Sequence, residues 1–447
     1  METVTIIPLK NLSTKKFQQI RDGQQEAAKV WNRCNEIHLA ARKACIEWPD
    51  LDDLRKATKG GQYKISSQTI QAIALTYITC VDVASKLRKN NSQSSIRYPY
   101  KEKKFFTLSF PQQALKYERD AQRLILPMGR GNPSLVLTGI ELPEKFGGCR
   151  IVWNGTYHEL HISRYYEPII IELDPEIAAC IDLGQIHQGA IVTNTGEALI
   201  VIGRGIRSLK RQLNKEIGKI CQKQSKCTKG SNRWRKLQHA KMKLIARVKR
   251  QIRELRHQGT NKLVQFCIRY KVSKVYIGNP QGVQHKNSGR MQNQRMSQWE
   301  FGKDINYLQY KLGKWLIQCF IGPERGTSSR CPVCDHQQKV SGRRWRCRAC
   351  NFEGHRDIVG AANMHQLAYG QKIVFPKTIT YLRAGLVKEY KRSEQPCMVA
   401  PAIQASSSRA DTRLSLNEAL LSRTGSEYKQ PHSRVSAPRG AAQLPIH

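Results

Sequence analysis

The chain has 447 residues, with 75 Lys plus Arg against 34 Asp plus Glu, and a formal net charge of +41. This length gives room for two or three domains with a sizeable core. The charge favours a polyanionic partner, because each cation that neutralises a phosphate releases a condensed counterion. A ribosomal or otherwise nonspecific basic protein is the competing interpretation of the charge alone.

The composition argues against export or membrane insertion. Residues 1–8 lack the basic segment and long apolar segment of a signal peptide. Apolar runs elsewhere look too short to cross a bilayer. Of the 14 cysteines, four form a cluster and ten are scattered, which indicates a reducing compartment and one metal site. We expect a cytoplasmic protein with no membrane partner. The family resemblance given below implies that it is prokaryotic and nucleoid-associated.

Residues 1 to about 170 have the pattern of a mixed α+β region. Helical spacing of apolar residues covers 17–43 and 67–87. Four short strand-like segments follow, at 105–110, 123–127, 149–153 and 159–163. A β-rich region with helical insertions fits this order.

Residues 176–201 predict a β-hairpin. The apolar segment 177–181 suits a buried strand, and the segments 190–192 and 198–201 flank a turn at 194–196. Directly after it, residues 204–256 carry 19 Lys plus Arg against two acids. Apolar stripes on both sides of a turn at 229–232 predict a helical hairpin with a cationic outside.

We expect this helical hairpin to bind nucleic acid. A solvated helix face is the alternative, but so many like charges without partners repel one another and disfavour it. The candidate contacts lie in the second helix of the hairpin: Arg233, Arg235, Lys236, Lys241 and Lys243.

The remaining elements predict an α/β domain. Strands are expected at 272–277 and 317–321, and helices at 296–316 and 358–367. This order, after the first hairpin, is the one an RNase H-like sheet requires. Beyond about residue 400 the chain is rich in Ser, Ala, Pro and Arg without periodicity, so the tail is expected to be largely disordered.

Two CxxC pairs predict a zinc site. Cys331 and Cys334 form the first pair, Cys347 and Cys350 the second, with twelve residues between them. Each pair can place its sulfurs on adjacent corners of a tetrahedron. Four thiolates leave no open position, so the zinc is expected to be structural.

Two aspartates are candidate ligands for Mg²⁺. Asp182 follows the apolar segment 177–181 and opens Asp182-Leu183-Gly184. A carboxylate that projects from a buried strand is costly unless it is paired or holds a metal. Asp357 lies seven residues after the last zinc cysteine, at the start of the predicted helix. Turn capping for Asp182 and helix N-capping for Asp357 are the structural alternatives. Carboxylate oxygens suit Mg²⁺, and phosphodiester cleavage commonly uses two such ions.

Between about residues 176 and 366 the chain resembles the TnpB family of transposon-encoded, RNA-guided nucleases, related to the type V CRISPR effectors. The resemblance rests on Ile181-Asp182-Leu183-Gly184, the basic hairpin, 299–310, Gly326–Ser329 leading into the first CxxC, the second CxxC, and Arg356-Asp357 with Ala361–Met364. It implies a RuvC-like nuclease of RNase H fold with an inserted zinc ribbon. It also implies a guide RNA and a double-stranded DNA target as partners.

The sequence departs from the family where the second RuvC carboxylate is expected. The resemblance implies a Glu at the end of the strand 275–280, but Gly278 and Asn279 stand there. Glu324 can replace it, because its strand is expected beside and parallel to the strand that ends at Gly278. Glu300, near the start of the intervening helix, is the other candidate. An ion pair of Glu324 with Arg325 and a first-turn acid at Glu300 are the structural alternatives.

The expected organisation follows from these pieces. The resemblance implies a wedge and recognition region at 1–170, a RuvC-like domain at 171–325 with the hairpin 204–256 inserted, a zinc ribbon at 326–353, the last RuvC helix at 354–370, and a tail at 371–447.

Three functions remain open at this stage. The favoured one is a Mg²⁺-dependent, RNA-guided DNA endonuclease that uses Asp182, Glu324 and Asp357, with Glu300 as the alternative third acid. The second is a guided DNA-binding protein without cleavage, and the third is a nonspecific zinc-ribbon protein without a guide. A transposase acting by strand transfer fits the carboxylates less well.

Overall fold

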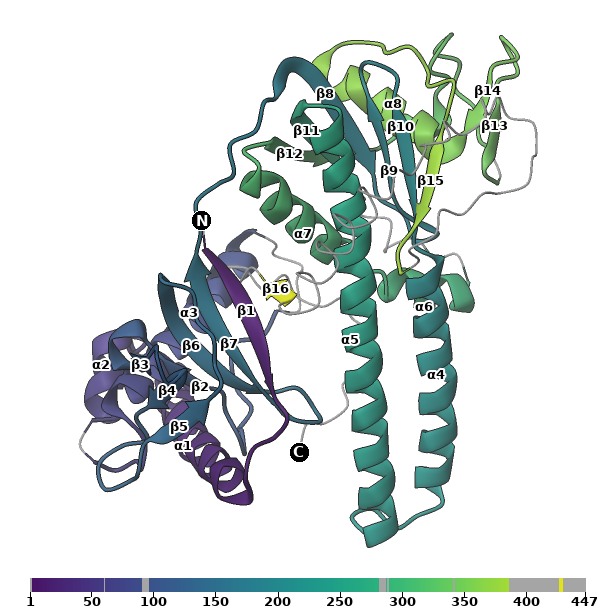
Figure 1. Ribbon diagram of the computed structural model, residues 1–447. Coiled ribbons are helices and arrows are strands. Elements are labelled where there is room, and N and C mark those ends of the chain that lie inside the picture. Colours follow the sequence, from purple (N-terminus) through teal and green to yellow (C-terminus); the bar gives the residue numbers. More distant parts are fainter. Residues whose placement is uncertain are drawn as a thin grey trace. The chain divides into compact units, whose positions relative to one another are not determined.

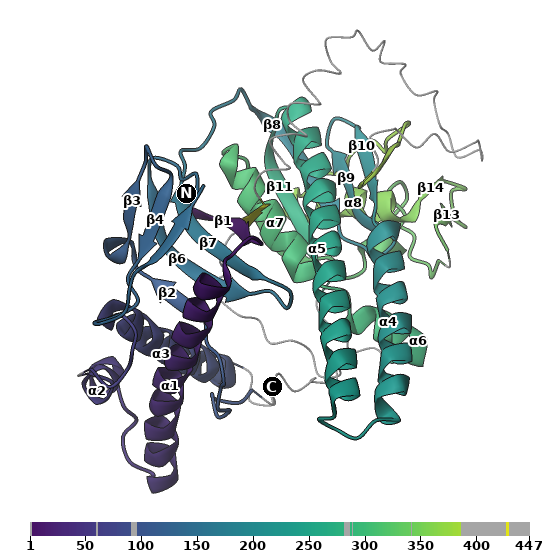
Figure 2. The ribbon, with the colours of Figure 1, turned by 60° about the horizontal axis from the view of Figure 1, so that its bottom comes forward.

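The structure is a computed structural model that describes residues 2–59, 61–90, 96–280, 287, 289–340, 342–385 and 426–428. The chain divides into two compact units (Figures 1 and 2). The first runs to Tyr166 and includes a strand near the C-terminus, and the second begins at Glu167. The sequence analysis placed this boundary near residue 170, four residues after Tyr166.

The first unit combines an antiparallel sheet with three helices. Its sheet has the order β16-β1-β7-β6-β2, built from β16 (Ser426–Tyr428), β1 (Glu2–Leu9), β7 (His158–Tyr165), β6 (Phe146–Trp153) and β2 (Leu108–Phe110). A smaller sheet holds β3 (Lys116–Glu118), β4 (Arg123–Leu126) and β5 (Leu135–Thr138). The helices are α1 (Thr14–Ala44), α2 (Leu51–Ala57) and α3 (Ser67–Asn90).

One apolar core joins these helices and strands. Trp31 of α1 and Tyr77 of α3 pack edge to face, and both contribute to a cluster that includes Leu108 and Ile151 of the sheet. By length and composition α3 could cross a membrane, in contrast to the sequence-based expectation. Ile70, Ile73, Ala74 and Tyr77 of α3 are buried in the unit, which is the pattern of a core helix.

The second unit is built on a six-stranded mixed sheet of the order β12-β11-β8-β9-β10-β15. β8 (Asp174–Asp182), β9 (His187–Thr193) and β10 (Ala198–Ile202) form an antiparallel meander. β11 (Val272–Asn279) lies parallel to β8, and β12 (Gln318–Pro323) lies parallel to β11. This is the RNase H-like arrangement that the sequence predicted. An additional strand, β15 (Thr380–Arg383), lies parallel to β10 within the segment that was assigned to the tail.

Helices cover both faces of this sheet (Figure 1). Alternation along β8 places Ala179 and Ile181 against α5 (Asn232–Arg269) and α7 (Phe301–Lys314). The opposite side chain, Cys180, packs against α8 (Arg356–Tyr369). Asp182 has the parity of Cys180, so it points to the α8 face.

The predicted helical hairpin is present. α4 (Arg204–Ser225) and α5 form a long antiparallel pair, which both ribbon views show. α5 continues past the predicted end at residue 256 and reaches Arg269, because its last turns bury Leu263, Val264 and Phe266 against the sheet. The predicted helix 296–316 is divided into α6 (Arg290–Ser297) and α7.

The inserted ribbon lies between β12 and α8. It contains a short helical turn at Thr327–Ser329 and the antiparallel pair β13 (Arg344–Arg346) and β14 (Glu353–His355). Its buried residues Cys331, Trp345 and Cys347 pack against Val359 of α8. The expectation of a disordered tail beyond about residue 400 falls outside the described residues, apart from β16.

Candidate active site and metal centre

Asp182 lies at the C-terminal end of the central strand β8 and faces α8. A Cβ atom at Gly360 of α8 would lie 2.7 Å from Oδ2 of Asp182, so the glycine allows the helix to approach the carboxylate. Burial raises the pKa of Asp182 well above its usual value, and the nearby charges of Asp357 and Glu324 raise it further. Arg343 and Arg356 counteract part of this effect. The charges of both other predicted acids therefore act on the Asp182 carboxyl.

Asp357 lies in the first turn of α8, on the same side of the sheet. The N-cap is His355 rather than Asp357, and its Nδ1 accepts a hydrogen bond from the backbone N–H of Asp357. The Asp357 carboxylate bonds to Nδ1 of His187 at 2.6 Å, and Arg343 donates to both of its oxygens at 2.6 and 2.8 Å. Burial raises the pKa of Asp357, but the His187 hydrogen bond and the Arg343 charge outweigh burial and lower it.

Glu324 fills the space that a side chain at Gly278 would occupy. β11 and β12 pair in register, with Gly278 opposite Gly322 and Asn279 opposite Pro323, so Glu324 leaves β12 beside the end of β11. A Cβ at Gly278 would lie 2.5 Å from Oε2 and 3.1 Å from Cβ of Glu324. It would also lie 2.8 Å from Sδ of Met364, so a side chain at 278 requires the ends of both flexible side chains to move from their present positions.

One oxygen of the half-buried Glu324 carboxyl lacks a hydrogen bond. This oxygen, Oε2, is inaccessible to solvent and has no hydrogen-bond partner among the described residues. Burial raises the pKa of Glu324 to about 7. A buried carboxylate without a partner is costly, and a cation is the usual compensation. The alternative interpretation, an ion pair of Glu324 with Arg325, does not occur among the described residues.

Glu300, the other candidate for the third acid, belongs to a different cluster. It is the N-cap residue of α7 and forms ion pairs with Lys210 of α4, Arg256 of α5 and Lys303. Burial raises the pKa of Glu300, but Arg256 and Lys303 outweigh it and lower the pKa to about 2. Within the described ranges Glu300 has no contact with Asp182 or Asp357, so its geometry is that of a structural ion pair.

The structure adds two histidines that the sequence analysis did not select. His187 begins β9 five residues after Asp182, and His355 precedes Asp357 by two residues. One nitrogen of each ring and a carboxylate oxygen of Asp357 all lie within 4.8 Å of one another. The three carboxylates do not form such a tight group among the described residues. A histidine just after the Asp182 turn was the available signal.

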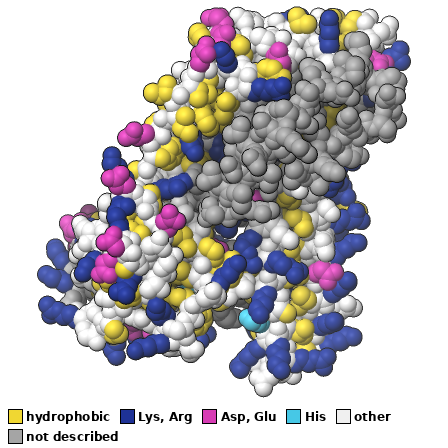
Figure 3. All heavy atoms as spheres, in the orientation of Figure 1, with side chains coloured by type: hydrophobic (Ala, Val, Ile, Leu, Met, Phe, Trp, Pro, Cys, Tyr) yellow, Lys and Arg dark blue, Asp and Glu magenta, His cyan; other side chains and the backbone are white. Residues whose placement is uncertain are grey.

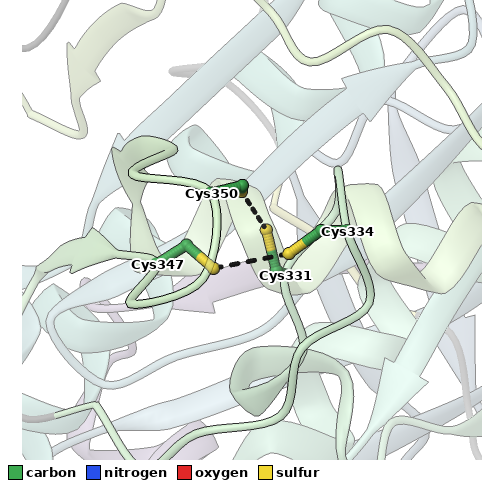
Figure 4. Close-up of side chains that lie close together, drawn as sticks. All are labelled: Cys331, Cys334, Cys347 and Cys350. Atoms are coloured by element: carbon green, nitrogen blue, oxygen red, sulfur yellow. Dashed lines mark hydrogen bonds between the residues drawn. The ribbon is translucent and has the colours of Figure 1, made fainter.

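The four cysteines converge as the CxxC spacing predicted (Figure 4). The sulfurs of Cys331 and Cys350 lie 3.6 Å apart, and those of Cys334 and Cys347 lie 3.5 Å apart. A tetrahedral zinc with Zn–S bonds of about 2.3 Å requires sulfur separations of about 3.8 Å. The donor set therefore fits one structural zinc ion.

A basic cavity of about 620 Å³ lies beside the Asp182 turn. Gly184, Gln185, α4 and α6 contribute to its wall, together with five cations that make no ion pair in the described part of the chain: Arg204, Arg207, Arg211, Lys215 and Arg295. Burial lowers the pKa of Arg207, and the charges of Arg295, Arg204, Arg211 and Arg343 lower it further. So many unpaired cations in one cavity favour a polyanionic ligand.

Four of the five cations predicted to contact nucleic acid lie at the surface of the hairpin. Arg233, Arg235, Lys236 and Lys243 are exposed, and Figure 3 shows Lys and Arg gathered over α4 and α5 with few acidic side chains among them. Lys241 requires a correction. It is 4% exposed and donates to Oε1 of Gln224 at 3.0 Å between the two helices, so it is a packing residue.

Comparison with known families and structures assigns the second unit. Residues 162–284 match the family model OrfB_IS605, described as a probable transposase, and residues 301–364 match the Cas12f1-like TNB domain. These two matches support a TnpB-like family for the second unit. The first match contains Asp182 and the hairpin, and the second contains Glu324, the ribbon and Asp357.

Solved structures support the fold of this TnpB-like chain. It is similar to a Cas12f1 in complex with single guide RNA and target DNA, with a TM-score of 0.56 and 13% identity over 78% of this chain and 82% of that chain. It is also similar to the mini-RNA-guided endonuclease Cas_phi3, with a TM-score of 0.50 and 10% identity over 84% of this chain and 93% of that chain. Comparison with curated proteins gives no match.

Proposed function

We propose that this TnpB-like protein is an RNA-guided DNA endonuclease whose RuvC-like site is rearranged, with Asp182, Glu324 and Asp357 as its three acids. The observation that carries the proposal is the exchange at Gly278, whose missing side chain leaves the volume that Glu324 fills. An acid lost from β11 is thereby supplied by the neighbouring strand at the same edge of the sheet. Glu300, with cationic partners on three sides, is not part of the proposed site.

The arrangement can hold divalent metal. The charge of Glu324 raises the pKa of Asp182, burial raises the pKa of Glu324, and Oε2 of Glu324 lacks a hydrogen-bond partner among the described residues. Such oxygens fit Mg²⁺, which would lower the pKa of a bound water and offset charge on the leaving oxygen. In this proposal the chain's own part is to hold the three acids on two strands and one helix, and to bring phosphate to them.

The cationic surfaces supply the expected nucleic-acid contacts. The cavity cations adjoin the turn after Asp182 and would orient the backbone of the strand to be cut. The exposed hairpin cations would bind the phosphates of a guide RNA or of the heteroduplex. The similar Cas12f1 structure is a complex with single guide RNA and target DNA, which supports the same partners here.

The domain roles follow from this function. We assign residues 1–170 to a nucleic-acid-binding wedge and recognition region, 171–325 and 354–370 to the RuvC-like nuclease, and 326–353 to a ribbon held by structural zinc. This function is compatible with a location in the prokaryotic cytoplasm, where the protein would act on DNA.

The competing function is guided DNA binding without cleavage. Arg343 favours it, because its guanidinium neutralises both oxygens of Asp357 where a metal would otherwise bind. Guided binding and cleavage can be separated by one experiment. The protein is purified with its co-expressed RNA and incubated with a matched duplex that carries randomised flanks, with and without Mg²⁺.

The decisive variants move the acid between the two strands. Glu324→Gly is expected to abolish cleavage but keep guide-dependent binding. The double variant Gly278→Glu with Glu324→Gly restores an acid at β11 and is expected to recover cleavage. Glu176→Gln, an exposed acid at the start of β8, is the control. Tight guided binding by the wild type without any cut would establish the competing function, and a chain that copurifies no discrete RNA would contradict both.

A further inference from the structure

The histidine pair beside Asp357 has no role in the function proposed above. His187 comes from β9, His355 caps α8, and Asp357 lies in the first turn of that helix. The two imidazole rings lie 5.1 Å apart between centroids, and a ring nitrogen from each lies within 4.8 Å of an Asp357 oxygen. His187 is buried, and His355 and Asp357 are half-buried. The cluster thus combines three ligand-bearing side chains from two elements in a largely enclosed position.

We infer that His187, His355 and Asp357 form a site for a divalent first-row transition ion, in preference to Mg²⁺. Two imidazoles and one carboxylate are a donor set that suits manganese and its softer neighbours, whereas Mg²⁺ selects oxygen ligands. The inference rests on the proposed function, because it makes Asp357 shared between this ion and the carboxylate site. It names the class of metal that the third acid of that site would hold.

The distances require only a small movement for an ion to enter. Nδ1 of His187 and Oδ2 of Asp357 are 2.6 Å apart and share a hydrogen bond. Two ligands that each lie about 2.1 Å from one ion are about 3 Å apart when their bonds meet near a right angle. The pair must therefore widen by about half an ångström, within the reach of a χ rotation in two side chains.

Arg343 is the group that an ion would displace. Its guanidinium donates to both oxygens of Asp357, while its side chain is 42% exposed. A bound dication repels the guanidinium and removes its reason to stay at Asp357. Because Arg343 leads into β13 at the surface, it can turn to solvent or to a phosphate without disturbing a packed core.

A different role for His187 is conceivable on the same geometry, namely a hydrogen bond that only orients Asp357. The two roles differ in whether nitrogen is bonded directly to the metal. Pulsed electron paramagnetic resonance of Mn²⁺ reports this difference, since a directly bonded ¹⁴N gives a hyperfine coupling that an outer imidazole does not give. This measurement does not depend on catalytic activity.

The experiment uses the full chain with its RNA, with zinc content measured so that the ribbon is loaded. Wild-type protein is expected to bind Mn²⁺ with ¹⁴N coupling, and equimolar Mg²⁺ should not displace it. His187→Asn and His355→Asn should each weaken Mn²⁺ binding at least about tenfold and reduce the coupling. His239→Asn, on the exposed side of α5, is the control.

The wild-type spectrum alone can overturn the inference, even if a variant fails to fold. Bound Mn²⁺ without nitrogen coupling, or Mn²⁺ that Mg²⁺ readily displaces, would sink it. Cleavage in Mg²⁺ combined with that spectrum leaves the nuclease proposal intact. Nitrogen-coupled Mn²⁺ in a protein that cuts no matched duplex would support the metal site and contradict the nuclease proposal.

Discussion

At the scale of single residues, the Glu324 carboxyl has the clearest effect on stability. Burial holds its pKa at about 7, above the ordinary value of 4.5. The folded chain therefore keeps this proton over a pH range in which the unfolded chain has lost it. Stability falls as pH rises from about 4.5 to about 7 and stays reduced above that range.

Replacing this acid should remove the pH dependence that it causes. Without added divalent metal, Glu324→Gln is expected to be more stable than wild type above pH 7, by up to about 3 kcal/mol. The difference should vanish below about pH 4.5. Urea unfolding at several pH values measures it, with the exposed Glu176→Gln as control. A wild type that is equally or more stable than the variant at pH 8 would contradict the buried, unpartnered carboxyl.

The sequence located these residues to different degrees. Asp182 and Asp357 follow from motif and alternation, and Glu324 follows from the parallel pairing of two strands, so the structure brings all three to one edge. Their catalytic role stays a prediction. His187 was not selected, because a histidine five residues after Asp182 is a weak signal until its contact with a residue 170 positions away is known. Lys241 was misplaced because helical spacing alone does not say which cation of a stripe faces the partner helix.

At the scale of elements, the ribbon depends on its metal. Trp345 and two of the cysteines are buried in a cluster that reaches Val359 of α8. Structural zinc contributes folding free energy directly, so Cys347→Ser should release the ribbon and loosen the start of α8. We expect a lower melting temperature and less than one zinc per chain.

The matched control for the ribbon is Cys45→Ser, at the exposed end of α1. It should change neither zinc content nor melting temperature appreciably. Melting curves of wild type that are the same with and without a zinc chelator would argue against the assignment.

The helical pair α4 and α5 should act mainly through charge. Reversing Arg233, Arg235, Lys236 and Lys243 to Glu is expected to weaken RNA binding and flatten its dependence on salt. Each lost phosphate contact lowers the slope of log K against log salt by about 0.7–0.9. Filter binding at several KCl concentrations measures the slope.

The control reverses cations that already have partners. Lys29, Arg33 and Arg55 pair with nearby acids in the first unit, so their reversal should change the slope less. Equal effects of the two sets would mean that binding follows total charge and not the hairpin.

Elements were predictable where periodicity was strong. The helices of α1, α3, α4 and α5 and the strands of the central sheet appear at the predicted places. β1 was missed because its apolar alternation is short and ends in Pro8 and Leu9. β15 was missed because Thr380–Arg383 carries one strongly apolar residue, and its pairing with β10 is a tertiary contact.

For the whole molecule, the net charge of +41 is itself a term in the folding free energy. Like charges on a compact chain repel one another, and a bound polyanion or added salt relieves the repulsion. RNA-free protein should therefore melt at higher temperature as KCl rises from about 0.1 to about 1 M, where the screening length shrinks from about 10 to 3 Å. The RNA-bound protein should show the opposite trend, because salt weakens the complex.

Differential scanning fluorimetry of the RNA-free and RNA-bound protein measures these opposite dependences of melting temperature on salt. The same melting curves with added urea, an uncharged solute, separate the screening of charges from general solvent effects. If salt lowered the melting temperature of both forms alike, self-repulsion would not be a significant part of the balance.

The shared volume at Gly278 and Glu324 limits how one version of this edge could descend from another. A chain carrying both acids must turn the flexible end of Glu324 away from its present position, because a side chain at 278 would meet it there. A stepwise exchange of the two acids therefore passes through a chain in which one carboxylate has turned away from the edge, or through a chain with neither carboxylate there. A comparison of single aligned positions can therefore find no acid at one strand of a site whose acid is supplied by the neighbouring strand.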